Sequence, residues 1–332
     1  MKIINLNHNF STTRKLTSDP LQYPILSPPN LERKGEGGLR TKGYFKHSYG
    51  ETSELSEKFT VPLVTIITVV FNGEKHLEQT IQSIISQTYD NVEYIIIDGG
   101  STDGTVDIIR KYEEVIDYWV SEPDKGIYNA MNKGIEKATG DFIIFINSGD
   151  NFTSSSVLEE VQSKLTSDFD IYYGDYYRIK SNSKRRKTFP ESLSFSYFYS
   201  GSLAHPATFF RRTLFDEIFF YNESYKIVSD WEFYIYAICY KNVKYHYLKT
   251  AISDFDFTGI SSNPKFKELE SQERKEVLEK YFPSFVADYE KLALLNSKRF
   301  QQILHIQKSP FLWSIFKGLV SFFLLFTPKF KK

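Results

Sequence analysis

The sequence predicts an α/β protein in which a mainly parallel sheet is flanked by helices. Apolar runs of strand length, such as residues 64–71 and 142–146, alternate with segments whose apolar residues recur at helical spacing. Alternating units of this length are typical of parallel strands joined by crossover helices. In sheets of this kind, ligands bind beyond the carboxyl ends of the strands.

The strand and helix patterns follow one another from residue 62 to residue 150. Four segments have strand patterns: "PLVTIITVVFN", "VEYIIIDGG", "DYWVSE" and "DFIIFINSGD". The segments between them have helical patterns: "EKHLEQTIQSIISQT", "STDGTVDIIRKYEEV" and "GIYNAMNKGIEKATG". Beyond residue 167, "FDIYYGDYYRIKSNSKRRKTF" predicts a hairpin, "HPATFFRRTLFDEI" a strand and a helix, and "SDWEFYIYAICY" a helix.

Composition divides the chain into three parts. Residues 1–60 are rich in Ser, Thr, Pro, Asn, Gly and charge and lack a period, which predicts a poorly ordered N-terminal extension. Residues 61–270 carry the α/β pattern, and residues 271–332 predict a helical C-terminal extension. Its last segment, "SPFLWSIFKGLVSFFLLFTPKFKK", is amphipathic and too short to span a bilayer, so we expect a helix on a membrane surface. The alternative is a helix packed on the protein itself or on a partner subunit.

Charge and cysteine content limit the partners and the compartment. Of the 332 residues, 41 are Lys or Arg and 41 are Asp or Glu. The chain therefore lacks the basic excess of nucleic-acid-binding proteins, and we expect no nucleic-acid partner. The single cysteine, Cys239, excludes an intrachain disulfide, and the N-terminus lacks the apolar core of a signal peptide. These observations predict a cytoplasmic protein.

Three polar clusters stand at the ends of predicted strands: Asn72-Gly73, residues 98–103 and residues 147–150. Asp98, followed by two glycines, suits a carboxylate that accepts hydrogen bonds from a base or a ribose; the alternative is a capped loop. The absence of a G-x-G-x-x-G pattern argues against a dehydrogenase. Oxygen donors such as those of residues 147–150 are what Mg²⁺ or Mn²⁺ prefers, although N-S-G-D also suits a plain β-turn.

Taken together, four of these segments resemble a known family. "VTIITVVFN", "IIIDGGSTDGT", "SEPDKGIYNAMNKG" and "FIIFINSGD" occur in the order of the GT-A domain of family 2 inverting glycosyltransferases, especially those of bacterial surface-polysaccharide synthesis. The resemblance runs from about residue 62 to about residue 240. It implies a GT-A fold and a hexosyltransferase that uses a nucleotide-diphosphate sugar, a UDP-sugar in particular, with Mn²⁺ or Mg²⁺ as cofactor. The implied acceptor is a hydroxyl of a glycan or lipid-linked glycan.

The resemblance also implies roles for individual residues. The nucleotide-sugar contacts would come from Val69, Phe71, Asn72, Asp98, Asp124, Lys125, Gly126, Asn132 and Ser148. Asp150 is the candidate metal ligand, because Asn147 stands where the family often has its first carboxylate. Asp230 matches the family's acidic base, with Ser229 in place of the usual Glu. His205, Arg211 and Glu232 are candidate contacts to the acceptor or to phosphate.

Two other functions remain open on these residues. A nucleotidyltransferase would use a similar sheet, but the basic glycine-rich phosphate loop that it needs after the first strand is missing. A catalytically silent protein that binds a nucleotide sugar or scaffolds an assembly is the second alternative, which Asn147 and Ser229 leave open.

Overall fold

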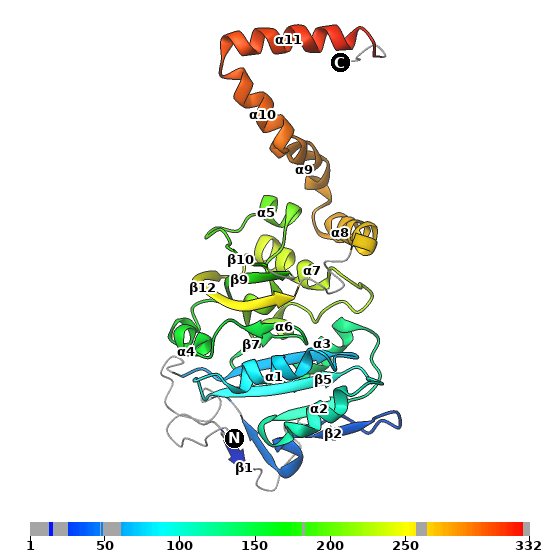
Figure 1. Cartoon of the computed structure of the whole chain (residues 1–332), viewed down its shortest axis with the longest axis vertical. Coiled ribbons are helices and arrows are strands. Elements are labelled where there is room, and N and C mark those ends of the chain that lie inside the picture. Colours follow the sequence, from blue (N-terminus) through cyan, green and yellow to red (C-terminus); the bar gives the residue numbers. More distant parts are fainter. Residues whose placement is uncertain are drawn as a thin grey trace. The chain divides into compact units, whose positions relative to one another are not determined.

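The computed structural model describes residues 13–15, 26–46, 48, 61–180, 183–256 and 264–327. The chain divides into two compact units, Met1–Arg274 and Lys275–Lys332. The first unit contains a ten-stranded mixed sheet with the order β2-β6-β5-β4-β7-β11-β9-β12-β8, and β10 pairs with β9 (Figure 1). The predicted α/β fold is confirmed.

The parallel part of the sheet forms its buried core. Its strands are β4 (Val64–Val70), β5 (Val92–Asp98), β6 (Tyr118–Ser121) and β7 (Phe142–Phe145), and every residue in them is buried. The connecting helices are α1 (Leu77–Ile85), α2 (Thr105–Lys111) and α3 (Ile127–Lys137). Helices α1 and α2 contact each other, and α3 packs on β4 and β5. All four strands point the same way, so their carboxyl ends share one edge of the sheet.

The second part of the sheet begins with a strand of reversed direction. The strands are β8 (Asn151–Phe152), β9 (Ile171–Lys180), β10 (Ser183–Lys187), β11 (Thr208–Arg211) and β12 (Tyr245–Asp256). Strands β9 and β10 form the predicted hairpin. Strand β11 is antiparallel to β7, and its last residue, Arg211, pairs with Phe142 at the start of β7. Arg211 therefore lies at the edge opposite the carboxyl ends of the parallel strands.

Short helices and one long helix complete the first unit. They are α4 (Val157–Val161), α5 (Phe195–Ser200), α6 (Leu214–Glu217), α7 (Ser229–Ile235) and the first part of α8 (Lys267–Tyr281). Helix α7 continues as a π-helix over Tyr236–Tyr240. The second unit contains α9 (Pro283–Asn296), α10 (Lys298–Gln307) and α11 (Pro310–Leu324).

Residues 26–46, here called the N-terminal arm, differ from the poorly ordered extension that the sequence predicts. They contain β2 (Gly35–Gly37), a 3₁₀ helix (Leu39–Lys42) and β3 (Tyr44–Lys46), which pairs with β1 (Thr13–Lys15). Strand β2 adds an antiparallel strand to β6. Polar side chains attach the arm to the sheet, so the sequence of the arm has no apolar period that would predict its structure. The remainder of the predicted extension, apart from β1 and Ser48, lies outside the described residues.

Two buried ion pairs attach the arm to the sheet. Arg40 Nη2 lies 2.6 Å from Glu93 Oε1 on β5, and both side chains are 0% exposed. Lys46 Nζ lies 3.1 Å from Asp117 Oδ2, again with both side chains buried. Because an unpaired buried charge is costly, the arm and the sheet depend on each other for stability.

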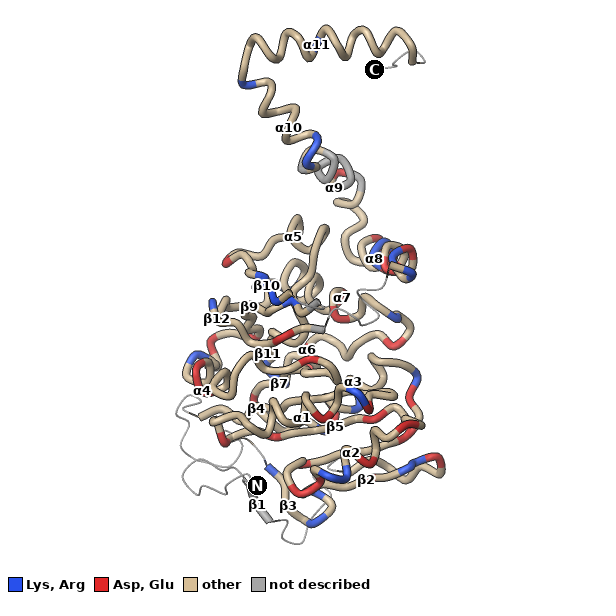
Figure 2. Tube along the Cα trace, in the orientation of Figure 1, with Lys and Arg blue, Asp and Glu red and all other residues tan. Residues whose placement is uncertain are grey.

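Helix α11 exposes a largely apolar surface. Its exposed large side chains are Phe311, Leu312, Ile315, Leu319, Val320, Phe322, Phe323 and Leu324. Figure 2 shows charges of both signs along α8, whereas Lys317 is the sole charged residue in the sequence of α11. Among the described residues, no helix combines the length and apolar composition that crossing a membrane requires.

Candidate functional site

A cavity of about 570 Å³ opens at the carboxyl ends of β4 and β7. Its other walls come from the start of α3, the segment between α5 and β11, the residues before and at the start of α7, the first turns of α8, and one side chain each of β9 and β12. Seven of the predicted site residues line it: Val69, Phe71, Asn72, Ser148, Asp150, His205 and Asp230. The candidate metal ligand and the candidate base, Asp150 and Asp230, thus face one cavity although 80 residues separate them in the sequence.

Asn72 connects the end of β4 to the loop that follows β5. It adopts a left-handed conformation (φ 52°), which asparagine tolerates better than most residues. Its backbone N–H donates to Ser101 Oγ at 2.7 Å, and its Oδ1 accepts from the N–H of Thr102 at 2.8 Å. The position of this loop therefore determines where Asn72 stands in the cavity wall.

The position of Asp98 does not match the direct contact to a base or ribose that was predicted for it. It is 0% exposed and is not among the residues that line the cavity. Its carboxylate accepts hydrogen bonds from the N–H of Ser101 at 3.0 Å, from Ser101 Oγ, and from Ser121 Oγ at 2.5 Å. Asp98 thus uses both oxygens to hold the loop. Gly100 in this loop has φ 83°, a conformation that favours glycine.

The candidates after β6 lie beside the cavity rather than in its wall. Asp124 Oδ1 accepts from the N–H of Gly126 at 2.8 Å, and burial raises the pKa of Asp124. A Cβ at Gly99 would collide with the Asp124 carboxylate, so the loops after β5 and β6 are in close contact. Lys125 is exposed, and its N–H donates to Asn129 Oδ1 at 3.2 Å.

The Asn132 side chain, predicted to contact the donor, is bound to other parts of the protein instead. Its Oδ1 accepts from the N–H of Tyr221 at 2.9 Å. Its Nδ2 donates to the carbonyl of Tyr221 at 2.8 Å and to Glu223 Oε1 at 3.0 Å. The amide therefore fastens α3 to the segment before α7.

The turn that ends β7 has the donor chemistry of a site for a hard cation. Asn147 Oδ1 and Ser148 Oγ are buried and have no hydrogen-bond partner within the described chain, and both residues line the cavity. Asp150, which is 4% exposed, belongs to the same turn. Thr80 on α1 holds this turn, since its Oγ1 donates to the Asp150 carbonyl at 2.8 Å. A carboxylate, an amide oxygen and a hydroxyl are ligands that Mg²⁺ or Mn²⁺ accepts, so these residues fit the predicted metal. Across the described residues, no cluster of three or more His, Cys, Asp or Glu has the arrangement of a metal site.

Asp230 stands in the first turn of α7 with a hydrogen bond from α3. Tyr128 Oη donates to Asp230 Oδ1 at 2.9 Å. Burial, together with the charge of Asp230, raises the pKa of Tyr128 well above its usual value, so the tyrosine stays protonated and remains the donor. One carboxylate oxygen is thus held by the protein.

An arginine and a tryptophan form the wall beside Asp230. The Arg274 guanidinium carbon lies 4.6 Å from the centre of the Trp231 ring, and Arg274 Nε lies 3.0 Å from Glu270 Oε1. Both Trp231 and Arg274 line the cavity. Burial lowers the pKa of Arg274, and the charges of Glu270 and Asp230 oppose that shift.

His205 is a neutral histidine in an aromatic environment. Its Nε2 lies 2.7 Å from Tyr221 Oη, and its ring stacks on Phe145 with 4.5 Å between centres. Burial lowers the pKa of His205 to about 4, although the charge of Asp230 acts in the opposite direction. His205 is therefore uncharged near neutral pH and cannot supply a positive charge to a phosphate there.

We expect stability to fall as His205 is forced to ionise. The pKa of a histidine in the unfolded chain is about 6.5, whereas burial lowers the pKa of folded His205 to about 4. Between these values the unfolded state holds more protons, so the free energy of unfolding should drop by about 2 kcal/mol from pH 7 to pH 5 through this residue. Urea denaturation of the wild type and His205→Gln at both pH values measures the difference. Equal pH dependence in the two proteins would contradict the assignment.

Arg211 and Glu232 do not occupy the predicted positions in the cavity. Arg211 pairs with Asp170 at 2.6 Å and with Glu217 at 2.8 Å at the opposite edge of the sheet, because β11 runs antiparallel to β7. Glu232 is 1% exposed on α7 and is not among the residues that line the cavity.

Sequence reasoning missed Tyr128, Trp231 and Arg274 as residues of this cavity. Tyr128 lies within the motif "EPDKGIYNAMNKG" and Trp231 follows the candidate base, so both had a local signal. Arg274 lies in a segment that the composition assigns to the C-terminal extension, and the sequence offers no signal that would bring it to Trp231.

The sequence of this chain is similar to those of known glycosyltransferases. A model of the family described as Glycosyl transferase family 2 matches residues 65–227. An uncharacterised glycosyltransferase of Mycobacterium tuberculosis is 32% identical over 212 residues, which cover 61% of this chain and 79% of the relative. The PGL/p-HBAD biosynthesis glycosyltransferase of Mycobacterium bovis is 29% identical over 216 residues, which cover 63% of this chain and 82% of the relative.

Two solved structures are similar to this chain at TM-scores below 0.5. S. aureus TarS 1–349 in complex with UDP is 20% identical with a TM-score of 0.49, covering 58% of this chain and 60% of that chain. The mannosyltransferase PcManGT from Pyrobaculum calidifontis, in complex with GDP-Man and Mn²⁺, is 14% identical with a TM-score of 0.48, covering 73% and 82%.

Proposed function

Because this chain belongs to glycosyltransferase family 2, we propose that it transfers a sugar from a nucleotide-diphosphate sugar to a hydroxyl of a glycan or lipid-linked glycan, with inversion. The pathway that we propose is the synthesis of a surface polysaccharide. The observation that carries this proposal is the shared cavity of Asp150 and Asp230. A carboxylate base, with a separate carboxylate that can hold a cation against the diphosphate, suits a single displacement at a sugar carbon.

In the proposed reaction, Asp230 is the general base. Its carboxylate takes the proton of the acceptor hydroxyl while that oxygen forms its bond to the anomeric carbon. The bond from this carbon to the diphosphate oxygen breaks, and the nucleoside diphosphate leaves with the electron pair. Because Tyr128 already occupies Oδ1, we assign proton abstraction to Oδ2. Attack and departure on opposite faces of the carbon give inversion.

The donor would lie between the end of β4 and the turn after β7. Phe71, which is 65% exposed, and Asn72 would contact the nucleoside, with Val69 behind them. Asp98 and Asp124 support the loops beside this region through the hydrogen bonds described above, and Asn132 holds α3 against the segment before α7. We take a UDP-sugar as the favoured donor.

We further propose Mn²⁺ or Mg²⁺ as cofactor, held by Asp150 together with Asn147 and Ser148. The two buried side-chain oxygens without a partner in the described chain support this assignment. Such an ion supplies positive charge that stabilises a departing diphosphate. Asp150→Asn should therefore weaken donor binding in the presence of Mn²⁺.

A screen of nucleotide sugars tests the proposed function. We expect one nucleotide sugar to raise the melting temperature, and Mn²⁺ to increase that shift. Addition of a lipid-linked glycan acceptor should then release nucleoside diphosphate, and EDTA should slow the release. Binding without release under all acceptors would indicate a silent binder, and formation of pyrophosphate from a nucleoside triphosphate and a sugar phosphate would indicate a nucleotidyltransferase.

We also propose a place on the inner face of the plasma membrane, reached through α11. Its exposed apolar side chains, such as Leu319 and Phe323, and the lysines at 317, 329, 331 and 332 support binding to an anionic surface. The protein should sediment with vesicles containing anionic lipid, and Leu319→Glu with Phe323→Glu should abolish this binding. Recovery of the wild type in the supernatant would contradict the proposal.

A further inference from the structure

The N-terminal arm makes direct contact with the loop that follows β5. Lys34 Nζ donates to the carbonyls of Gly100 and Ser101, each at 2.8 Å. The backbone N–H of Lys34 donates to the carbonyl of Ser121 at 2.8 Å, at the end of β6. One residue of the arm thus fixes the ends of two neighbouring parallel strands. Two consecutive carbonyls bound by one ammonium group are held more firmly than neutral hydrogen bonds would hold them.

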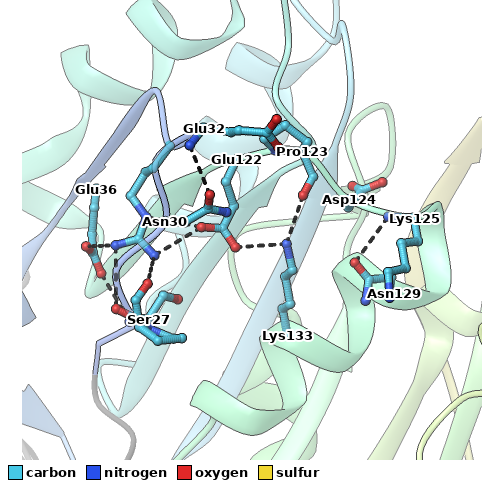
Figure 3. Close-up of polar contacts among 12 residues, drawn as sticks. Ser27, Asn30, Glu32, Glu36, Glu122, Pro123, Asp124, Lys125, Asn129 and Lys133 are labelled. Carbon is cyan, nitrogen blue, oxygen red and sulfur yellow. Dashed lines mark hydrogen bonds and ion pairs between the residues drawn. The ribbon is translucent and has the colours of Figure 1, made fainter.

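A second set of contacts fastens the arm to the loop that follows β6. Glu122 accepts from Arg33 at 3.0 Å and from Lys133 at 2.9 Å. Burial alone would raise the pKa of Glu122, but these two cations lower it, so the carboxylate stays charged. Figure 3 shows Lys133 reaching from α3 to Glu122 and to the carbonyl of Pro123, which lies at 3.2 Å. The arm, β6 and α3 therefore share one network next to Asp124.

The contact of Lys34 extends to the wall of the cavity through one residue. Ser101 Oγ, in the loop that Lys34 holds, accepts the backbone N–H of Asn72 at 2.7 Å. Asn72 lines the cavity, and both its backbone N–H and its side-chain Oδ1 bind this loop, so its position depends on the loop. Lys34 is therefore connected to the cavity wall by two hydrogen bonds, one to Ser101 and one from Asn72 to Ser101.

We infer that Lys34 is a positioning residue for the nucleotide of the donor, because it holds the loop that sets Asn72. The inference rests on the proposed function, in which Asn72 and Phe71 contact the nucleoside. Lys34 lies on a segment that does not line the cavity, and the loop that it holds binds Asn72. Its loss should therefore weaken donor binding and leave the chemical step and acceptor binding as they are.

The experiment compares three variants of the full chain. Lys34→Met removes the ammonium group and keeps much of the side-chain length, and Lys34→Arg keeps the charge and the donors. Lys42→Met is the matched control, because Lys42 lies on the same arm but pairs with Glu114 at an exposed position. Donor dissociation constants are measured by titration with UDP-sugars and other nucleotide sugars, and kcat, acceptor KM and melting temperature are measured alongside.

Lys34→Met should raise the donor dissociation constant about tenfold, which is the size expected for one lost charge-assisted interaction. Its kcat at saturating donor, its acceptor KM and its melting temperature should stay near those of Lys42→Met. Lys34→Arg should recover most of the lost affinity.

The possible results separate this inference from the proposed function. If the wild type binds no nucleotide sugar, the proposed function fails first. If the wild type binds one and Lys34→Met binds it equally well, the positioning role is overturned while the function stands. The inference would also be overturned if Lys34→Met lowered the melting temperature, the donor affinity and kcat together and Lys34→Arg showed the same losses. Lys34 would then be a general support of the fold.

Discussion

Asp230→Asn is expected to reduce sugar transfer by at least about a thousandfold, which is within the range for a lost general base. The amide has nearly the shape of the carboxylate and can still accept the hydrogen bond from Tyr128, but it cannot take the proton of the acceptor hydroxyl. Donor binding should remain near that of the wild type, since Asp230 acts on the acceptor. Turnover is followed as released nucleoside diphosphate, and donor affinity by titration.

Asp216→Asn provides the control for the loss of a carboxylate. Asp216 lies on α6, pairs loosely with Arg212 at 3.9 Å and is not among the residues that line the cavity. Its activity should match that of the wild type. Full turnover in Asp230→Asn would remove Asp230 from the mechanism, and an equal loss in Asp216→Asn would point to a change in the fold instead.

Arg40→Met is expected to lower the free energy of unfolding by about 3–5 kcal/mol, the cost of leaving one partner of a buried ion pair alone. Glu93 is completely buried, and although burial alone would raise its pKa, Arg40 and hydrogen bonds from Thr139 and Thr65 keep that pKa low. Without Arg40, the carboxylate must either stay charged in an apolar interior or take up a proton. Urea denaturation at neutral pH measures the loss.

Two further variants test whether the loss of stability comes from the unpaired charge of Glu93. Lys42→Met removes a cation from the same arm, but the pair of Lys42 with Glu114 is exposed, so we expect a change of less than about 1 kcal/mol. Arg40→Met combined with Glu93→Gln should regain part of the stability, because the buried charge is then gone. An unchanged unfolding curve in Arg40→Met would mean that the arm does not contribute to the stability of the sheet.

Local sequence patterns were sufficient to predict the part of the fold from β4 to β7. Each of its strands is a short apolar run and each helix has its own apolar period, so neighbouring residues carry the information. The same regularity placed Asp150 beyond the end of β7, where it lines the cavity. Strand direction is not encoded in this way, and the sequence pattern of β11 is the same for either direction. For that reason Arg211 was expected at the cavity and lies at the opposite edge.

Pairings between distant segments account for what the sequence did not reveal. Arg40 meets Glu93 and Lys46 meets Asp117 across more than 50 residues, and neither pair produces a periodic pattern. Asp98 looked like a ligand because it ends a strand before two glycines, but its partner Ser121 belongs to another strand. Arg274 likewise became part of the site through its contact with Trp231. Such side chains can be assigned only after the strand order is known.

The sheet ends on both sides in very short strands, β2 with three residues and β8 with two. Few unpaired backbone groups remain there for a foreign strand, which discourages aggregation through the sheet margins. A chain shortened to begin at residue 61 would lack β2, so the backbone groups of β6 that pair with β2 would be exposed. Such a fragment should associate with itself in solution, even though it would retain the whole stretch that the family shares.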